Sequence, residues 1–173
     1  MTVTAISIRS AMDADLPALL EIFNREVVES PYLYMETPVT IDDRRKWLDQ
    51  HGAAGFPVLV ATEPDAPGQV LGYGALSSYR PSSGYRFTAE VSVYVAPFAQ
   101  RRGIGGRLLG SLRDEARAIG LHALVASIDS ENMPSVALFE RCGFTEAARL
   151  REVGRKFGQW RTQLLLIQIL EQS

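Results

Sequence analysis

A glycine-rich turn at residues 103–106 lies between a strand-like and a helix-like segment, and this order constrains the fold more than any other feature. Residues 87–95 are rich in β-branched and aromatic side chains, which is typical of a strand. Residues 108–119 have the pattern of a helix, which Gly120 closes. A strand, a tight turn and a helix in this order predict a ligand site at the start of the helix.

The residues of this turn favour an anionic ligand. In QRRGIGG, residues 100–106, three glycines in four positions let the backbone approach a ligand without interference from Cβ atoms. The free amides at the helix start favour phosphate, and Arg101 and Arg102 add positive charge. The segment lacks the Lys-Ser/Thr ending of a P-loop and the GxGxxG spacing of a dinucleotide site. On this segment alone, a glycine-rich turn with merely exposed arginines stays an open alternative.

The remaining segments predict a mixed sheet covered by helices. Helical patterns begin at Asp15 and Thr40, each in the position of an N-cap, and at Asn132. Strand–helix alternation with an antiparallel beginning and end indicates an α/β (α+β) protein. We expect a single domain over residues 1–173, with further strands near residues 3–8, 57–61, 70–78, 121–128, 144–153 and 160–170.

Composition limits the partners. The net charge of -2 does not favour nucleic acid, and no stretch reaches the roughly 18 apolar residues of a membrane span. The single cysteine, Cys142, excludes an intramolecular disulfide and favours a reducing compartment. With two histidines the chain offers little from which to build a metal site. We therefore expect a cytoplasmic protein that binds no nucleic acid, no membrane and no metal.

Two segments resemble the GNAT superfamily of N-acetyltransferases. Residues 100–106 resemble its pyrophosphate loop, Q/R-x-x-G-x-G/A, and residues 132–144, NMPSVALFERCGF, resemble its second cofactor element. Residues 84–95 and 156–160 look like the phosphinothricin and methionine-sulfoximine acetyltransferases within it. The resemblance implies a mixed, mostly antiparallel sheet of six or seven strands, with about four helices around it. It also implies acetyl-CoA as co-substrate and a small primary amine as acceptor.

The resemblance also implies how the chain holds acetyl-CoA. The backbone of Val93, Tyr94 and Val95 would bind the pantetheine arm. The pyrophosphate would lie on the turn and the first helical residues, namely Arg101, Arg102, Gly103, Ile104, Gly105 and Gly106. Asn132 matches a cofactor-contacting asparagine, although a structural role as a helix cap is equally open.

Glu90 occupies the position of the superfamily's general base. Its carboxylate interrupts an otherwise apolar, β-branched strand, and an attacking amine must lose a proton. The alternative is a solvated residue or an ion pair with Arg86. Strand alternation places Ser92 on the same face as Glu90, and we expect both residues beside the substrate. Arg80 matches an arginine that would grip a substrate carboxylate, and Tyr34 matches a segment that folds over the acceptor.

Three departures from the resemblance affect specificity. Phe139 replaces a tyrosine that can protonate the departing thiolate, and Val91 stands where close relatives often carry histidine. Arg161-Thr162 replaces a pair that usually ends in aspartate. We therefore expect transfer to an amino-acid-like amine, with a peptide or lysine acetyltransferase and a non-catalytic CoA-binding module as alternatives. A cysteine hydrolase that uses Cys142 with His51 or His122 is disfavoured.

The oligomeric state follows from the resemblance alone. Relatives commonly form dimers, so we expect a homodimer. The apolar strand at residues 164–170 is either part of its interface or an inner strand of the core.

Overall fold

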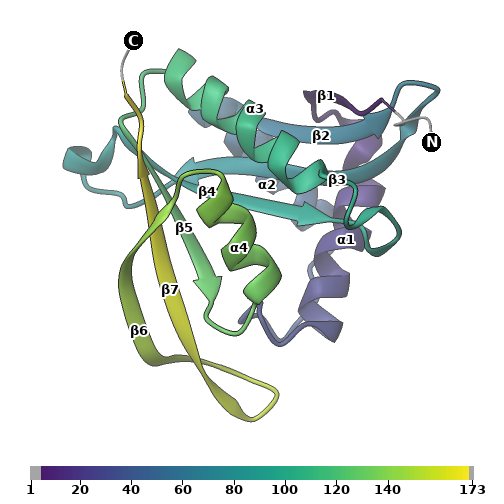
Figure 1. Ribbon diagram of the computed structural model, residues 1–173. Coiled ribbons are helices and arrows are strands. Elements are labelled where there is room, and N and C mark those ends of the chain that lie inside the picture. The colour runs from purple at the N-terminus through teal and green to yellow at the C-terminus, as the bar shows by residue number, and fades with distance from the viewer. Residues whose placement is uncertain (1–4, 172–173) are drawn as a thin grey trace.

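The fold is an open seven-stranded sheet with two helices on each side, as a computed structural model describes it for residues 5–171 (Figure 1). The strands are β1 Ser7–Ser10, β2 Val58–Glu63, β3 Ala66–Ser78, β4 Thr88–Val95, β5 Ala123–Asp129, β6 Thr145–Lys156 and β7 Gln159–Ile169. The α-helices are α1 Leu16–Glu29, α2 Ile41–Ala54, α3 Ile104–Ala118 and α4 Met133–Arg141. Short 3-10 turns are formed by Asp13–Asp15, Ser83–Tyr85 and Pro97–Ala99.

The strand order is β1-β2-β3-β4-β5-β7-β6, and all neighbours except β4 and β5 are antiparallel. Sequence analysis predicted this mixed, mostly antiparallel sheet and its helices. In Figure 1, α3 and α4 lie in front of the sheet, and α1 and α2 lie behind it. Because both faces of the centre are covered, residues 70–76 of β3 are all buried and form a continuous run without alternation.

The core lies on both faces of β3. Leu19 from α1 packs on one side, and Leu108 and Leu112 from α3 pack on the other, each almost fully buried. Two glycines of β3, Gly72 and Gly74, let β4 and α3 approach closely. A Cβ at Gly72 would lie 2.7 Å from the Tyr94 carbonyl oxygen. This packing fixes β4 firmly in the middle of the sheet.

Several boundaries differ from the sequence-based expectation. The first strand is Ser7–Ser10 and not residues 3–8, of which 3 and 4 lie outside the described residues. Asp15 does not cap α1 with its side chain, because its carboxylate binds Arg9 at 2.7 and 2.8 Å and the Met12 amide. Thr40 does cap α2, and accepts a hydrogen bond from the Asp43 amide.

Two further differences concern α3 and β7. Helix α3 begins at Ile104 and not near 108, so Gly105 and Gly106 lie in its first turn. Strand β7 pairs with β5 on one side and with β6 on the other. Residues 164–170 therefore form an inner strand, and Leu164, Leu166 and Leu170 are buried in the core.

Candidate active site

The sheet opens between β4 and β5. Their parallel ladder joins only three residue pairs, of which the last is Glu90 with Val125. Beyond it β4 continues to pair with β3 up to Val95, whereas β5 turns away to pair with β7 (Figure 1). Within the described sheet, residues 91–95 therefore have no ladder partner on the β5 side. Backbone groups of this stretch are available to a ligand lying in the opening.

The N-terminus of α3 lies next to this opening. Gly103 is its N-cap, with φ of +76°, a left-handed conformation that favours glycine. The N–H groups of the first turn have no acceptor within the helix and carry the positive end of its dipole. A Cβ at Gly105 would meet Leu138 Cδ2 of α4 at 2.8 Å, so glycine lets the two helices pack closely. The glycine turn and the helix start are present, and their local geometry suits an anion.

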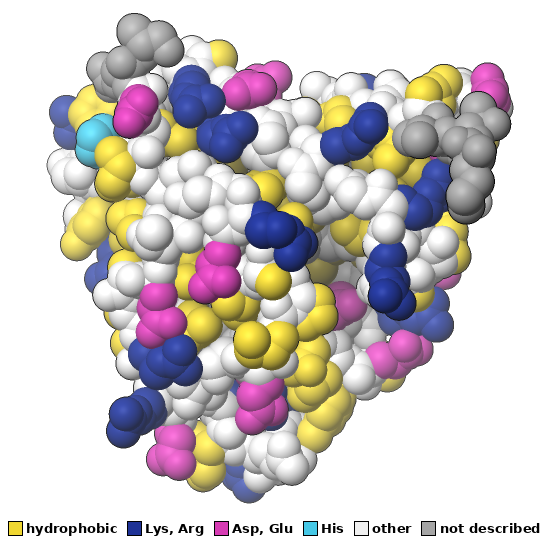
Figure 2. All heavy atoms as spheres, in the orientation of Figure 1, with side chains coloured by type: hydrophobic (Ala, Val, Ile, Leu, Met, Phe, Trp, Pro, Cys, Tyr) yellow, Lys and Arg dark blue, Asp and Glu magenta, His cyan; other side chains and the backbone are white. Residues whose placement is uncertain are grey.

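Three arginines surround this helix end, and they are not equivalent. Arg101 is exposed and also left-handed, with φ of 63°. Arg102 donates to Glu63 at 2.6 Å, so its charge is already paired. Arg107 reaches the Ile6 carbonyl oxygen at 3.5 Å. Figure 2 shows Lys and Arg side chains gathered around a hollow beside this end of α3.

Helix α4 borders the opening on the other side. The Asn132 side chain accepts a hydrogen bond from the Ser135 amide at 3.3 Å, so it caps the helix. Phe139 is buried and packs edge-on against Phe144, with ring centroids 5.1 Å apart. The capping role of Asn132 leaves its amide N–H₂ free for other contacts. Phe139 is a core residue with no proton to give.

Glu90 is half-buried at the point where the opening begins. Across the β3–β4 ladder it lies opposite Ser77. The alternative partner, Arg86, instead donates to the Ser83 carbonyl oxygen at 3.0 Å and stacks on Phe87. Within residues 5–171 the Glu90 carboxylate forms no salt bridge. It is therefore available to a ligand.

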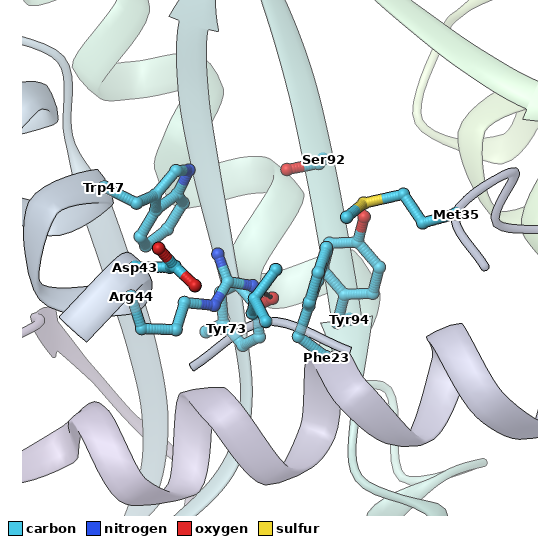
Figure 3. Close-up of a pocket in the computed structure, with 9 residues that line it drawn as sticks. Phe23, Met35, Asp43, Arg44, Trp47, Tyr73, Ser92 and Tyr94 are labelled. Carbon is cyan, nitrogen blue, oxygen red and sulfur yellow. Dashed lines mark hydrogen bonds between the residues drawn. The ribbon is translucent and has the colours of Figure 1, made fainter. Parts of the chain in front are cut away.

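A cavity of about 320 Å³ lies on the α1–α2 side of β4 (Figure 3). Two of its wall residues, Ser92 and Tyr94, follow Glu90 on the same face of the strand, as strand alternation predicted. The other lining residues are Phe23, Met35, Val39, Asp43, Arg44, Trp47 and Tyr73. The size fits a small molecule, and the walls are mainly aromatic and apolar with a few polar groups, which is typical of ligand pockets.

The Tyr94 ring lies inside this aromatic wall. It stacks on Tyr73 at a centroid distance of 5.2 Å and meets Phe23 edge-on at 5.7 Å. Burial raises the pKa of Tyr94 to about 12, and Glu26 and Glu90 add to the rise. The hydroxyl is therefore protonated at neutral pH.

Two residues that we expected near the substrate do not line the cavity. Arg80 is exposed, in the turn after β3, with its guanidinium over the rings of Tyr79 and Tyr85 at 5.2 and 5.6 Å. It lies beyond the end of β3 that neighbours Glu90. Tyr34 is not part of the cavity wall, and its hydroxyl donates to Asp129 at 2.8 Å.

Asp129 is the centre of a buried network that sequence reasoning missed. Arg161 donates to both of its carboxylate oxygens at 2.8 Å and also pairs with Glu131 at 3.0 Å. Asp129 and Arg161 are 3% and 5% exposed, so the pair is well shielded from water. The network ties the segment around Tyr34 to the ends of β5 and β7. The departure at Arg161 thus has a structural role, while Thr162 lines a separate hollow with Ser130 and Arg149.

Lys156 also holds the segment that contains Tyr34 and Met35, and the sequence did not predict this role. Its ammonium is buried and donates to the carbonyl oxygens of Val27 and Met35. Because Met35 lines the cavity, Lys156 helps to position that wall. In the sequence it looks like an ordinary exposed lysine in a hairpin, so no local signal identifies it.

The cysteine hydrolase alternative has no support in this geometry. Both ring nitrogens of His51 are engaged, with the Trp47 carbonyl oxygen at 2.7 Å and the Ser77 hydroxyl at 3.0 Å. Cys142 follows the end of α4, where its carbonyl oxygen accepts from Gln168. Across residues 5–171, no three His, Cys, Asp or Glu side chains gather in a way that could hold a metal ion. None of the helices described is long and apolar enough to cross a membrane.

The two sides of β4 are suited to bind two different ligands next to each other. One side offers backbone amides and a helix N-terminus, which bind a phosphorylated, extended molecule. The other offers a small aromatic pocket, and Glu90 lies where the two sides meet. A carboxylate at such a junction is suited to accept a proton during group transfer.

Comparison with known proteins identifies similar chains. Residues 17–144 match the family described as "Acetyltransferase (GNAT) family". The L-methionine sulfoximine/L-methionine sulfone acetyltransferase of Pseudomonas aeruginosa is 44% identical over 154 residues, covering 89% of this chain and 88% of that protein.

Solved structures of acetyltransferases are also similar to this chain. The ribosomal-protein-alanine N-acetyltransferase from Brucella melitensis is 44% identical, with a TM-score of 0.91, and covers 95% of this chain and 99% of that one. The phosphinothricin acetyltransferase from Sinorhizobium meliloti in complex with AcCoA is 30% identical, also with a TM-score of 0.91. It covers 95% of this chain and 88% of that one.

Proposed function

Because the chain belongs to the acetyltransferase (GNAT) family, whose members use acetyl-CoA, we propose that it acetylates the primary amine of a small amino-acid-like substrate. The substrate class is that of methionine sulfoximine, methionine sulfone and phosphinothricin. The observation that carries this proposal is the cavity of about 320 Å³ on the face of β4 that also bears Glu90. The names of the similar enzymes support the same class.

The reaction is a direct transfer within a complex of both substrates. Glu90 accepts a proton from the substrate ammonium, directly or through water, and this frees the nitrogen lone pair. A free α-amino group has a pKa of about 7.7–8.0, so a modest base is sufficient. The nitrogen attacks the thioester carbonyl, the carbon–sulfur bond breaks, and CoA leaves as a thiolate while the nitrogen passes its second proton to solvent water. Main-chain amides of β4 would polarise the carbonyl oxygen.

Acetyl-CoA would lie in the opening between β4 and β5. The backbone of residues 93–95 holds the pantetheine arm, since these residues have no ladder partner on the β5 side in the described sheet. The pyrophosphate lies on residues 101–106 at the start of α3, and the free amide of Asn132 contacts the cofactor from α4. These assignments rest on local geometry that suits an anion and an extended arm.

The departing thiolate needs no tyrosine at position 139. Tyr94 packs among Tyr73 and Phe23 on the acceptor side, and Phe139 has no hydroxyl. A thiol such as that of cysteine has a pKa of about 8.5, so the thiolate is only a weak base and leaves unprotonated or takes its proton from water.

On the acceptor side, Ser92 lines the pocket. Arg80, in the turn that follows the Glu90 end of the β3–β4 ladder, grips the α-carboxylate. Arg80 can swing because its side chain is exposed and held only by two tyrosine rings. Tyr34 acts indirectly and does not touch the substrate. Its hydroxyl is bound to Asp129, and its ring supports the segment that carries Met35.

A second candidate is acetylation of the N-terminus of a peptide. It is favoured by the 44% identity to a ribosomal-protein-alanine N-acetyltransferase. The small size of the pocket, about 320 Å³ with walls from both helices α1 and α2, favours a free amino acid instead. A non-catalytic CoA-binding module would bind acetyl-CoA without amine-dependent thiol release.

Thiol release from acetyl-CoA against a panel of amines tests the proposal. The panel holds phosphinothricin, methionine sulfoximine, methionine sulfone, common amino acids, polyamines and alanine-starting peptides. The proposal expects release with the first three. Release with peptides alone would favour the second candidate, and binding of acetyl-CoA by calorimetry without release from any amine would favour the non-catalytic module.

We also propose that the protein is a cytoplasmic homodimer. Because β7 is an inner strand, residues 164–170 are not available for the contact. The exposed apolar side chains of the β6–β7 hairpin are better candidates, namely Leu150, Val153, Phe157 and Trp160. Light scattering on the purified protein gives the mass, and a monomer at micromolar concentration contradicts this assignment.

A further inference from the structure

The acceptor pocket contains a buried cation whose role the reaction above does not explain. Arg44 of α2 is only 4% exposed. Its guanidinium carbon lies 3.9 Å from the centroid of the Phe23 ring and 4.4 Å from that of Trp47. Figure 3 shows the guanidinium in the middle of the lining residues. These cation–π contacts hold the group in place but accept none of its hydrogen bonds.

The hydrogen-bond capacity of Arg44 is largely unused. One terminal nitrogen, Nη2, donates to the Tyr73 hydroxyl at 2.7 Å, whereas the buried Nε has no partner. No carboxylate of the described residues forms a salt bridge with it. Asp43, its neighbour in the wall, is bound to the amide and hydroxyl of Thr40. A buried guanidinium with five donors and one protein acceptor is suited to a ligand that brings oxygen atoms.

The position of Arg44 relative to Glu90 determines which oxygen atoms of a substrate it can bind. Along α2, Trp47 stacks on His51 at 4.3 Å, and His51 contacts Ser77 at 3.0 Å. Ser77 lies opposite Glu90 in the ladder, whereas Tyr73, the partner of Arg44, lies opposite Tyr94. Arg44 and Glu90 are therefore at opposite ends of one strand face, with Ser92 between them. Tyr94 is four residue steps along the strand from Glu90, or about 13 Å at roughly 3.3 Å per step.

This separation favours a ligand of Arg44 other than the α-carboxylate. In an amino acid the nitrogen and the carboxyl carbon are bonded to the same atom and lie about 2.5 Å apart. An amine near Glu90 therefore keeps its carboxylate at the same end, where Arg80 lies. Oxygen atoms at the far end of an extended four-atom side chain lie roughly 6 Å from the nitrogen, in the direction of Ser92 and Arg44.

We propose that Arg44 is a specificity-determining residue that binds the terminal oxygen atoms of the substrate side chain, such as sulfonyl, sulfoximine or phosphinate oxygens. The aromatic rings of Phe23, Trp47 and Tyr73 enclose the methyl and methylene groups beside them. This assignment rests on the proposed function and extends it, because it names the part of the substrate that the enzyme selects. Amino acids that lack such oxygen atoms leave the guanidinium donors without partners and are poor substrates.

A substrate pair measures this selection. The ratio of kcat/KM for methionine sulfone to that for methionine is compared between the wild type and Arg44→Met, whose apolar side chain fills similar space. We expect the ratio to fall at least tenfold, as for a charge-assisted hydrogen bond, with unchanged acetyl-CoA affinity. The matched variant Arg80→Gln should lower kcat/KM for both amino acids by the same factor. A ratio that Arg44→Met leaves unchanged overturns the assignment.

A second measurement uses the folded wild-type pocket and does not depend on the stability of Arg44→Met. The chain has two tryptophans, and Trp160 is 61% exposed in the distant hairpin, so Trp160→Phe leaves Trp47 as the only indole. With CoA present, methionine sulfone should change the Trp47 fluorescence at a concentration at least tenfold lower than methionine does. Equal responses to both amino acids overturn the role of Arg44.

The two proposals fail in different ways. Acetylation of amino acids without preference for the sulfone overturns the Arg44 assignment alone. A sulfone-specific Trp47 response without acetyl transfer to any amine overturns the proposed reaction and supports the binding role of Arg44.

Discussion

The cofactor side and the acceptor side of β4 are built in different ways. On the cofactor side, most groups that we assign to acetyl-CoA come from one short stretch of sequence, residues 93–106, and many of them are main-chain amides; Asn132 of α4 is the exception. On the acceptor side, the pocket is lined by side chains from α1, α2, β3, β4 and the segment before α2. A backbone site requires glycines and a helix start, so it leaves a local pattern. A side-chain site is assembled only when distant elements pack together.

The largest effect is expected at Glu90, where the cofactor side and the acceptor side of β4 meet. Glu90→Gln keeps the shape of the side chain but removes its ability to accept a proton at neutral pH. Turnover should fall about 10²–10⁴-fold, the usual contribution of a general base, with little change in acetyl-CoA affinity by calorimetry. Wild-type turnover of the variant across the whole pH range contradicts the base assignment.

Loss of the buried ion pair should be the largest effect on stability. Asp129→Asn leaves the Arg161 charge buried without its main partner, so the free energy of unfolding in urea should fall by about 3–5 kcal/mol. Tyr34→Phe removes only one hydrogen bond to Asp129 and should lower it by about 1 kcal/mol. Equal effects of the two substitutions would show that the ion pair is not the main contribution.

The same pair predicts a pH dependence. Burial on its own raises the pKa of Asp129, but hydrogen bonds from Arg161, the Glu131 amide and Tyr34 outweigh it, and the pKa is lowered. The stabilisation is therefore complete above the unfolded value of about 3.9 and is lost as the pH falls through the lower folded value. The stability difference between wild type and Asp129→Asn should shrink as the pH falls below about 4. A constant difference down to pH 2 contradicts the assignment.

On the cofactor side, glycine packing should affect stability and acetyl-CoA binding more than any one side chain does. In Gly105→Val the new side chain meets Leu138, so the free energy of unfolding should fall by about 1–3 kcal/mol and acetyl-CoA should bind less tightly. Gly110→Ala is a matched control, because a Cβ there meets no atom within 4 Å and alanine favours a helix. If both variants bind acetyl-CoA like the wild type, the start of α3 is not the pyrophosphate site.

The arginines of the turn should give the smallest effects. Arg101→Gln should weaken acetyl-CoA binding by roughly two- to fivefold, as expected for an exposed charge. Arg102→Gln should weaken it less, because Arg102 already pairs with Glu63. Calorimetry at low and high salt checks this, since screening should reduce both effects. A larger effect for Arg102 would mean that it leaves Glu63 when the cofactor binds.

The contrast between the two sides also explains what could be predicted from the sequence. The turn at 100–106, the strand at 87–95 and the helix after Asn132 follow local rules of propensity and capping, and the structure places them next to each other as expected. The start of α3 was misplaced by four residues because glycines indicate a turn, although here two of them pack inside the helix.

The acceptor side was harder to predict. In an amphipathic helix, Arg44 looks like a solvent-facing residue, and only the packing of α2 on α1 and β3 buries it among Phe23, Trp47 and Tyr73. Asp129, Arg161 and Lys156 lie in separate segments, and their contacts with each other, with Tyr34 and with Met35 form only when these segments pack together. Tyr34 was noticed for its position, but its hydroxyl bond to Asp129 could not be foreseen.

Product analysis shows directly whether the protein transfers the acetyl group from acetyl-CoA to an amino acid. Purified protein is incubated with acetyl-CoA and L-methionine sulfone, and free CoA and the acetylated amino acid are quantified by mass spectrometry over time. CoA and N-acetyl-methionine sulfone should form in a ratio of one to one, and neither should form in the absence of the amine. Release of CoA without an acetylated amino acid, or acetylation of peptides alone, would contradict it.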